Sequence, residues 1–244
     1  YARTILKSII TSTEEYPVTL ITGARQVGKS TVVSYFETKG YKYISFDDTE
    51  LLKKAKENPK KFIEEQGFPI IIDEIQRAKE LFIEIENIVN KTRREKGTLA
   101  ANGMYILTGS QKFHLMKGVS ESLSGRVGII EMEPLSQAEI RNWKEQPFIV
   151  DLEQLSNKVD DRYLSDDDLY LSIVRGFYPA RWEIEGKPIN NYYSNYLRTF
   201  IERDVRELIN IKDLNKFENF IKVLASTTGE ELNINNISKI VGID

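Results

Sequence analysis

One eight-residue segment constrains this chain more than any other, because it places two glycines, a lysine and a serine at fixed positions. Residues 23–30 read GARQVGKS and fit the pattern GxxxxGK[ST]. The apolar residues 17–22 before it predict a buried strand, and residues 31–39, followed by Gly40, predict a helix. Glycines allow a tight turn that points successive backbone N–H groups at one anion, which the helix start also attracts. The segment therefore predicts a phosphate-binding loop for a nucleoside triphosphate.

We expect ATP or ADP with Mg²⁺ as the ligands of this loop. Lys29 would supply positive charge for the β and γ phosphates, and Ser30 would give its hydroxyl to Mg²⁺. A glycine turn with an incidental lysine is the alternative, and the flanking strand and helix argue against it. The residues expected to contact the nucleotide are Gly23, Ala24, Arg25, Gln26, Val27, Gly28, Lys29, Ser30 and Thr31.

Composition narrows the class of protein and the metal. The 244 residues are 41% hydrophobic, enough for one large domain or one domain with a smaller appendage. The sequence has no long apolar run and begins too polar for a signal peptide, so we expect a cytoplasmic protein without a membrane partner. With no cysteine and one histidine, His114, thiolate and multi-histidine metal sites are excluded. The net charge of −3 gives no overall signature of nucleic-acid binding.

The order of apolar segments predicts an α/β fold with a doubly wound parallel sheet. Buried or alternating runs separated by helical patterns are typical of this class. Beyond about residue 135 the pattern becomes helical only, and residues 151–168 read as an acidic surface connection. The expected strands are 17–22, 41–46, 68–72, 104–107 and 127–132, and the expected later helices are 136–143, 169–174, 191–210, 217–225 and 235–241.

Two carboxylates follow the third expected strand directly. Asp73 would hold Mg²⁺ through its water shell, and Glu74 would polarise the water that attacks the γ-phosphate. The alternative is that both acids only solvate the end of a strand.

Three further candidate residues lie next to the fourth and fifth expected strands. Thr108 and Ser110 come after the fourth expected strand, where a hydroxyl would bond the attacking water or the γ-phosphate, or would only stabilise a turn around Gly109. Arg126 precedes the fifth strand and would reach the γ-phosphate of a neighbouring subunit as an arginine finger. A surface ion pair is the other reading of Arg126. We expect His114 to lie on a helix surface.

With these residues assembled, the chain resembles AAA-type P-loop ATPases of the additional-strand, catalytic-glutamate class. More closely, it resembles prokaryotic ATPases in which an AAA domain is followed by a winged helix and a restriction-endonuclease-like domain. The resemblance implies the strand order 5-1-4-3-2 and an α-helical lid after the sheet. The blocks that carry it are 23–30 (GARQVGKS), 72–76 (IDEIQ), 107–111 (LTGSQ), 121–126 (ESLSGR), 134–139 (PLSQAE) and 196–205 (YLRTFIERDV).

The resemblance also implies roles for single residues. It assigns nucleotide and metal chemistry directly to Lys29, Ser30, Asp73 and Glu74, and by motif position alone it singles out Arg126, Arg198, Arg203 and Asp204. Related signal-transducing ATPases place a Gly-x-Pro near the adenine. Residues 176–179, GFYP, resemble the family's GGYP, which makes Pro179 a candidate nucleotide contact, although Phe177 replaces the second glycine. A helix end followed by a turn is the alternative there.

The same resemblance implies three parts: a P-loop AAA-type core at 1–134, a helical lid at 135–213, and the beginning of a helix-turn-helix or winged helix at 214–244. The recognition helix would come next, so we expect the sequence to be a fragment that lacks the endonuclease-like domain. The alternative is a terminal helical pair that completes the lid.

Three functions are compatible with these residues. The first is a Mg²⁺-dependent ATPase whose nucleotide state moves the lid or the subunits and so controls a downstream domain or partner. The second is a slow signalling switch, gated by ADP and ATP, with negligible turnover. A P-loop kinase is the third, which adjacent Asp73 and Glu74 fit less well. Besides ATP, the partners to test are a second copy of the chain, and DNA or an effector protein at the C-terminal region.

Overall fold

The computed structural model describes residues 1–110, 119, 122–145, 149–156, 164–183, 189–200 and 213–242. The chain forms two compact units, Tyr1–Glu185 and Gly186–Asp244, which are described separately. Three residues singled out from the sequence, His114, Arg203 and Asp204, lie outside the described ranges, as do parts of the blocks 107–111, 121–126 and 196–205.

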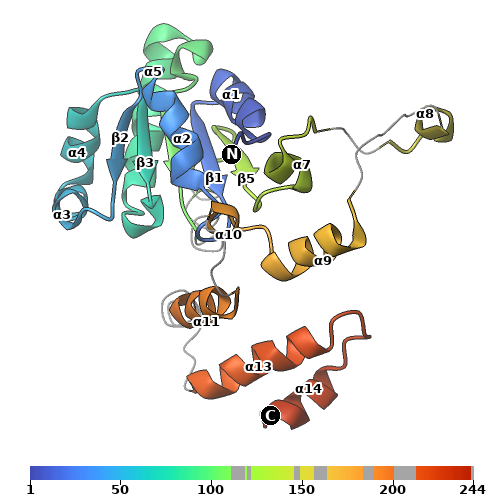
Figure 1. Ribbon diagram of the computed structural model, residues 1–244. Coiled ribbons are helices and arrows are strands. Elements are labelled where there is room, and N and C mark those ends of the chain that lie inside the picture. The colour runs from blue at the N-terminus through green and yellow to red at the C-terminus, as the bar shows by residue number, and fades with distance from the viewer. Residues whose placement is uncertain are drawn as a thin grey trace. The chain divides into compact units, whose positions relative to one another are not determined.

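The first unit is built on a sheet of five parallel strands in the order β2-β3-β4-β1-β5 (Figure 1). This confirms both the predicted parallel sheet and the strand order 5-1-4-3-2. In the central register, Leu20 pairs with Leu107 on one side and with Ile129 on the other. The strands are β1 (Val18–Thr22), β2 (Lys42–Ser45), β3 (Ile70–Asp73), β4 (Tyr105–Thr108) and β5 (Val127–Glu131).

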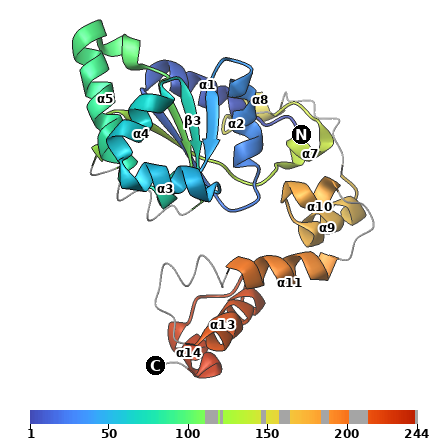
Figure 2. The same cartoon turned by 90° about the vertical axis from the view of Figure 1, so that its left-hand side faces the viewer.

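Each face of the sheet carries its own hydrophobic core, because alternate side chains of a strand point to opposite faces. Leu20 and Leu107 belong to the larger core under α3 (Thr49–Glu57), α4 (Pro59–Gln66) and α5 (Leu81–Lys96). Ile21 and Ile106 belong to the core under α1 (Leu6–Glu15) and α2 (Lys29–Glu37). Figure 2 shows α3, α4 and α5 on one side of the sheet and α2 on the other.

Helix α1 has no counterpart among the expected elements. The helix is rich in polar residues, so its narrow apolar stripe gives a weak helical pattern in the sequence. Ile9 of this stripe is fully buried. The helix packs on β1 and β5, where the Ser12 and Thr19 hydroxyls lie 2.9 Å apart in a buried hydrogen bond. A Cβ on Gly128 of β5 would lie 2.2 Å from Ser12 Oγ, so this close approach requires glycine.

Helix α7 (Gln137–Arg141) lies within the expected helix 136–143, and the segment after it is more helical than expected. Residues 151–168 were expected to form only a connection, yet they include α8 (Leu152–Ser156) and the first turn of α9 (Asp166–Arg175). Local hydrogen bonds account for this, because the side chains of Asp151 and Ser165 accept backbone N–H groups of Gln154 and Asp168 at the two helix starts. Among the described residues of this unit, α10 (Pro179–Glu183) follows α9, and two short 3-10 helices lie at Ile75–Arg77 and Thr98–Ala101.

The second unit contains α11 (Ile189–Phe200), α13 (Leu214–Ser226) and α14 (Ile234–Val241), of which α13 and α14 pack together. Helices were expected at 191–210, 217–225 and 235–241, and 201–210 lie outside the described residues. Throughout the described ranges, no helix is both long enough and apolar enough to cross a membrane.

Replacing Gly128 with alanine tests the packing of α1 on β5. The added Cβ would overlap Ser12 Oγ and lie 2.9 Å from the Tyr16 ring, so we expect the free energy of unfolding to fall by about 1–3 kcal/mol. Urea denaturation measures this change. Lys7→Ala, at an exposed position of α1, is the control and should change stability by less than about 0.5 kcal/mol. A Gly128→Ala variant as stable as the control would contradict the packing.

Candidate functional site

The loop at residues 23–30 leaves the C-terminal end of β1 and enters α2 at Lys29. Gly23, Gln26 and Gly28 have positive φ angles of 141°, 63° and 95°. Only glycine fits the first of these positions, because a Cβ on Gly23 would lie 2.2 Å from the carbonyl oxygen of Met132 at the exit of β5. The loop therefore has the tight backbone that the sequence predicted, and it lies against the segment that follows β5.

Lys29 is buried at the start of α2, with only 7% of its surface exposed. Its Nζ donates hydrogen bonds to the carbonyl oxygens of Gly23 (3.0 Å) and Ala24 (2.8 Å). These bonds fold the side chain back over the loop. The ammonium group thus lies at the concave side of the turn, where an anion held by the loop would meet it.

Asp73, the last residue of β3, connects the loop to the middle of the sheet. Its carboxylate is 5% exposed and accepts hydrogen bonds from Ser30 Oγ (2.8 Å) and Tyr43 Oη (2.7 Å), as well as from Thr108 Oγ1. The donors come from α2, β2 and β4, respectively. The structure therefore brings Ser30 and Asp73 together, as the sequence predicted, and adds Tyr43 and Thr108.

Tyr43 was not among the candidate residues. It sits in the middle of a strand with alternating polarity, where an aromatic residue is expected for packing alone. The role of Tyr43 follows from the strand register instead. Ser45 of β2 pairs with Asp73, so this short strand lies beside the carboxylate. The Thr108 hydroxyl, a candidate contact to phosphate, is directed at Asp73 instead.

Glu74 follows Asp73 in the left-handed backbone conformation, with φ 58° and ψ 41°. Non-glycine residues rarely adopt this region, and such residues cluster at functional sites. Because of this turn, the Glu74 side chain does not follow the alternation of side chains between the two faces of the sheet. Its carboxylate accepts a hydrogen bond from Gln76 Nε2. Glu74 therefore stands beside Asp73 without sharing its hydrogen-bond partners.

Ser110 lies just beyond β4 at the same edge of the sheet. Its Oγ is buried and has no hydrogen-bond partner among the described residues. A buried hydroxyl without a partner is unfavourable unless a ligand or water satisfies it. The contact of Ser110 with a phosphate or water stays a prediction, for which this hydroxyl is available.

The donor set near Ser30 fits Mg²⁺. This ion prefers oxygen ligands and usually keeps several waters besides one or two protein groups and the substrate phosphates. Ser30 and Asp73 offer a hydroxyl and a carboxylate 2.8 Å apart. Within the described ranges, no cluster of three or more acidic, histidine or cysteine residues could form an all-protein metal cage.

Pro179, at the start of α10, lies beside the loop. Its Cγ is 4.0 Å from the point where a Cβ on Gly28 would be, and Met132 and Arg3 approach the same point. The structure thus brings the predicted Pro179 to the loop from the helical part of the chain. Arg3 and Met132 carried no recognisable motif, and their proximity comes from the fold.

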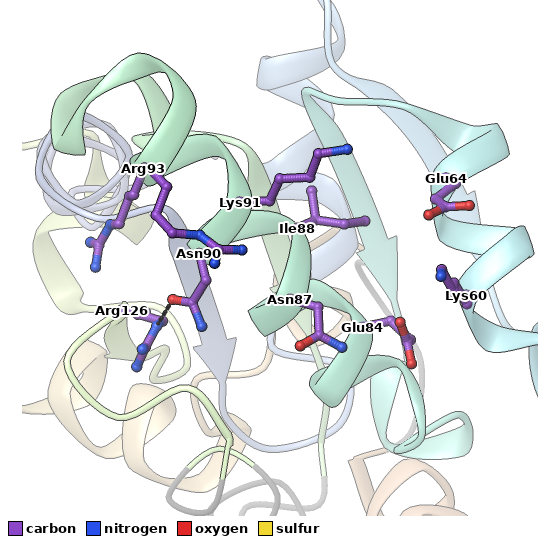
Figure 3. Close-up of a pocket in the computed structure, with 10 residues that line it drawn as sticks. Lys60, Glu64, Glu84, Asn87, Ile88, Asn90, Lys91, Arg93 and Arg126 are labelled. Carbon is purple, nitrogen blue, oxygen red and sulfur yellow. Dashed lines mark hydrogen bonds between the residues drawn. The ribbon is translucent and has the colours of Figure 1, made fainter.

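Arg126 lies at the other end of the sheet. It precedes β5, whose first residue pairs with the first residue of β1, so it is about 20 Å from the start of the loop along the strand direction. Its Nε donates to Asn90 Oδ1 (2.8 Å) on α5, as Figure 3 shows, and its Nη1 donates to the Ser124 carbonyl (2.8 Å). Glu86 Oε1 lies 3.6 Å from Nη2. Arg126 therefore does not approach the loop of its own chain.

Arg126 borders a groove between α4 and α5 that is lined mainly by charged side chains (Figure 3). Lys60, Lys91 and Arg93 outnumber the acids Glu64 and Glu84 among the labelled residues. In the second unit, Arg198 is part of α11 and lines a hollow with residues of α13.

The hydroxyl of Tyr43 gives a pH-dependent test of the Asp73 contacts. Its pKa is raised, first by burial of the phenol and second by the hydrogen bond and negative charge of Asp73. The unfolded chain loses this proton near the ordinary tyrosine pKa of about 10, whereas the folded chain keeps it. The stabilising contribution is therefore complete below that pH and is lost as the pH rises above it.

We expect the urea midpoint to fall less steeply above about pH 10 in Tyr43→Phe than in the unaltered protein. Some pH dependence remains, because burial also raises the pKa of Tyr41 and Tyr105. Tyr1→Phe, at an exposed ring, is the control. Equal slopes in Tyr43→Phe and the unaltered protein would show that Tyr43 does not donate to Asp73.

The chain resembles solved structures at low sequence identity, and this likeness shows the fold alone. No curated protein matches the chain. Among solved structures, a Walker-type ATPase of Pyrococcus abyssi is similar, with 15% identity and a TM-score of 0.52 over 97% of this chain and 86% of that one. AMPPCP-bound DnaA from Aquifex aeolicus is 15% identical, with a TM-score of 0.45 over 97% and 73% of the two chains.

Two families match the sequence. Residues 166–244 match a domain of unknown function, and residues 15–141 match the AAA domain. The second match covers more than half of the chain and includes the whole sheet, the glycine loop and the two carboxylates. The chain therefore belongs to the AAA domain family, with the parallel sheet of a P-loop ATPase.

Proposed function

We propose that this chain binds and hydrolyses ATP with the help of Mg²⁺. The hydrogen bond from Ser30 to the buried Asp73 carries the proposal, because it joins the phosphate loop to a carboxylate held at the edge of the sheet. Family membership supports the same conclusion. A merely structural glycine turn would not explain a lysine folded over the loop, nor a second acid immediately after Asp73.

Each residue then has a defined task. The backbone N–H groups of residues 23–31 and the ammonium of Lys29 bind the phosphates. Ser30 and Asp73 would hold Mg²⁺, which, when bound, neutralises charge on the β- and γ-phosphate oxygens. Glu74 orients a water and accepts its proton while the water oxygen bonds to the γ-phosphorus. The bond from that phosphorus to the bridging oxygen breaks, and ADP and phosphate leave. The Ser110 hydroxyl bonds the γ-phosphate or the water.

The helical part would sense the nucleotide. Pro179 approaches the loop from α10 and is our candidate for a contact with the adenosine part of the ligand. We divide the chain by function into an ATPase core at 1–134, a lid at 135–213 and a partner-binding segment at 214–244. Nucleotide exchange would move the lid and so control a downstream partner, for which an effector protein or DNA are the candidates.

One observation favours a second function, a slow nucleotide-gated switch. The chain's own Asn90, Ser124 and Glu86 surround the Arg126 guanidinium, far from the loop in the same chain. If transition-state charge is stabilised by an arginine from a neighbouring copy, an isolated chain lacks that group and turns over slowly. Rate measurements at several protein concentrations separate the two functions.

Variants of Lys29 and Glu74 test the ATPase. Lys29→Ala removes the buried charge, so we expect loss of measurable ATP binding in calorimetric titrations. Glu74→Gln keeps the side-chain shape but cannot accept a proton, so ATP should bind normally while phosphate release slows by about 10²–10⁴-fold. Glu65→Gln, at an exposed position of α4, is the matched control and should behave as the unaltered protein. Unchanged hydrolysis by Glu74→Gln would remove its assigned role.

Arg126→Ala tests whether a second copy completes the site. We expect the hydrolysis rate per molecule to rise with protein concentration in the unaltered protein and to stay low and flat in Arg126→Ala, because only the former supplies an arginine in trans. The matched control is Arg94→Ala, because Arg94 is an exposed arginine of α5 that lines the same groove as Arg126. Flat, very low rates in all three proteins would instead support the nucleotide-gated switch.

A further inference from the structure

We propose that Arg3 is a positioning residue of the nucleotide site, which orients the peptide between Val27 and Gly28 and links it to helix α7. The proposal rests on the ATP-binding function above and extends it to a residue outside the loop and the two carboxylates. Arg3 lies 20 residues before Gly23 and fits no nucleotide-binding pattern, so only the tertiary structure points to it.

The guanidinium of Arg3 joins three segments. Nη1 donates a hydrogen bond to the Val27 carbonyl in the loop (2.7 Å). Nη2 donates to the carbonyls of Glu133 (2.6 Å) and Pro134 (3.2 Å), where the chain leaves β5. Nε lies 3.0 Å from Glu139 Oε2 on α7. A planar guanidinium can make all these contacts at once, and an ammonium group cannot.

The hydrogen bond to the Val27 carbonyl also determines the direction of the Gly28 N–H, which belongs to the same peptide unit. A peptide unit is planar and trans, so the Val27 carbonyl and the Gly28 N–H point in opposite directions. Gly28 has a φ of 95°, a region in which glycine has unusual freedom. By holding the carbonyl on the outer side, Arg3 would fix the Gly28 N–H toward the inner side, where the phosphates bind.

The contact with Glu139 extends this link to the lid. Glu139 accepts hydrogen bonds from the Thr4 N–H (2.7 Å) and the Ser136 N–H (3.1 Å), so it caps α7 and holds the N-terminal segment. The side chains of Arg3 and Glu139 are only 9% and 7% exposed. This buried ion pair has a defined geometry, unlike an exposed one, because both side chains are also hydrogen-bonded to backbone groups. A shift of the loop at Val27 would therefore change the position of Arg3 and, with it, the contacts at the start of α7.

Arg3→Met tests the first part, because it keeps an unbranched apolar stem and removes the hydrogen bonds. We expect ATP and ADP to bind about tenfold more weakly, measured by calorimetry. Val89→Ala, in the core under α5 and remote from the loop, controls for loss of stability. Arg3→Lys restores the positive charge but not the planar set of N–H donors. It should therefore bind ATP more tightly than Arg3→Met and more weakly than the unaltered protein.

Amide hydrogen exchange with and without saturating ATP tests the second part. In the unaltered protein, ATP should slow exchange both in residues 27–31 and in residues 137–141. Glu139→Gln leaves the bond from Arg3 to Val27 in place and removes the negative charge on α7 that faces Arg3. It should therefore bind ATP within about threefold of the unaltered protein and lose the slowing at 137–141. This variant also keeps the proposal testable if Arg3→Met does not fold.

The outcomes are distinguishable. If the unaltered protein binds no ATP, the proposed function fails and the role of Arg3 fails with it. If it binds ATP and Arg3→Met binds equally well, the role of Arg3 in the loop is wrong while the ATPase stands. If exchange at 137–141 slows equally in Glu139→Gln and the unaltered protein, the link to α7 is wrong.

Discussion

The buried carboxylate of Asp73 is the interaction on which the rest of the site depends. An ionised carboxylate inside a sheet is unfavourable unless hydrogen bonds satisfy it. Here Ser30, Tyr43 and Thr108 all donate to it, from α2, β2 and β4. The loop, the strand order and the start of α2 must all be in place for these donors to meet. The carboxylate therefore ties the phosphate loop to the centre of the fold.

Two residues at the edge of the sheet have backbone conformations that side chains disfavour. Gly23 touches the Met132 carbonyl so closely that no side chain fits, and Glu74 has a left-handed conformation without being glycine. Both residues lie at the carboxyl ends of parallel strands, the edge at which ligands bind in open α/β sheets. The surrounding core, formed by two clusters on opposite faces of the sheet, holds these conformations.

The N-terminal segment belongs to the nucleotide-site region, although nothing in its pattern indicated this. Helix α1 covers β1 and β5, and Arg3 before it contacts the loop and the exit of β5. Pro179 approaches the same point from α10. Residues separated by more than 170 positions thus converge on Gly28. This convergence is the structural basis of our proposal that the loop is linked to the helices beyond the sheet.

The sequence by itself determined the parallel sheet, the loop at 23–30 and the carboxylates after β3, since apolar periodicity and glycine spacing are local properties. The strand order needed the family resemblance. Helix α1, the donor Tyr43, the Arg3 contacts and the intrachain pairing of Arg126 were decided only by tertiary structure. These side chains are ordinary in type. Tyr43 donates to a residue 30 positions away and Arg126 to Asn90, 36 positions away, while the carbonyls that Arg3 contacts lie 24 to 131 positions away. Local sequence patterns do not predict pairs of residues that are far apart in the chain, because only strand register and helix packing bring such residues together.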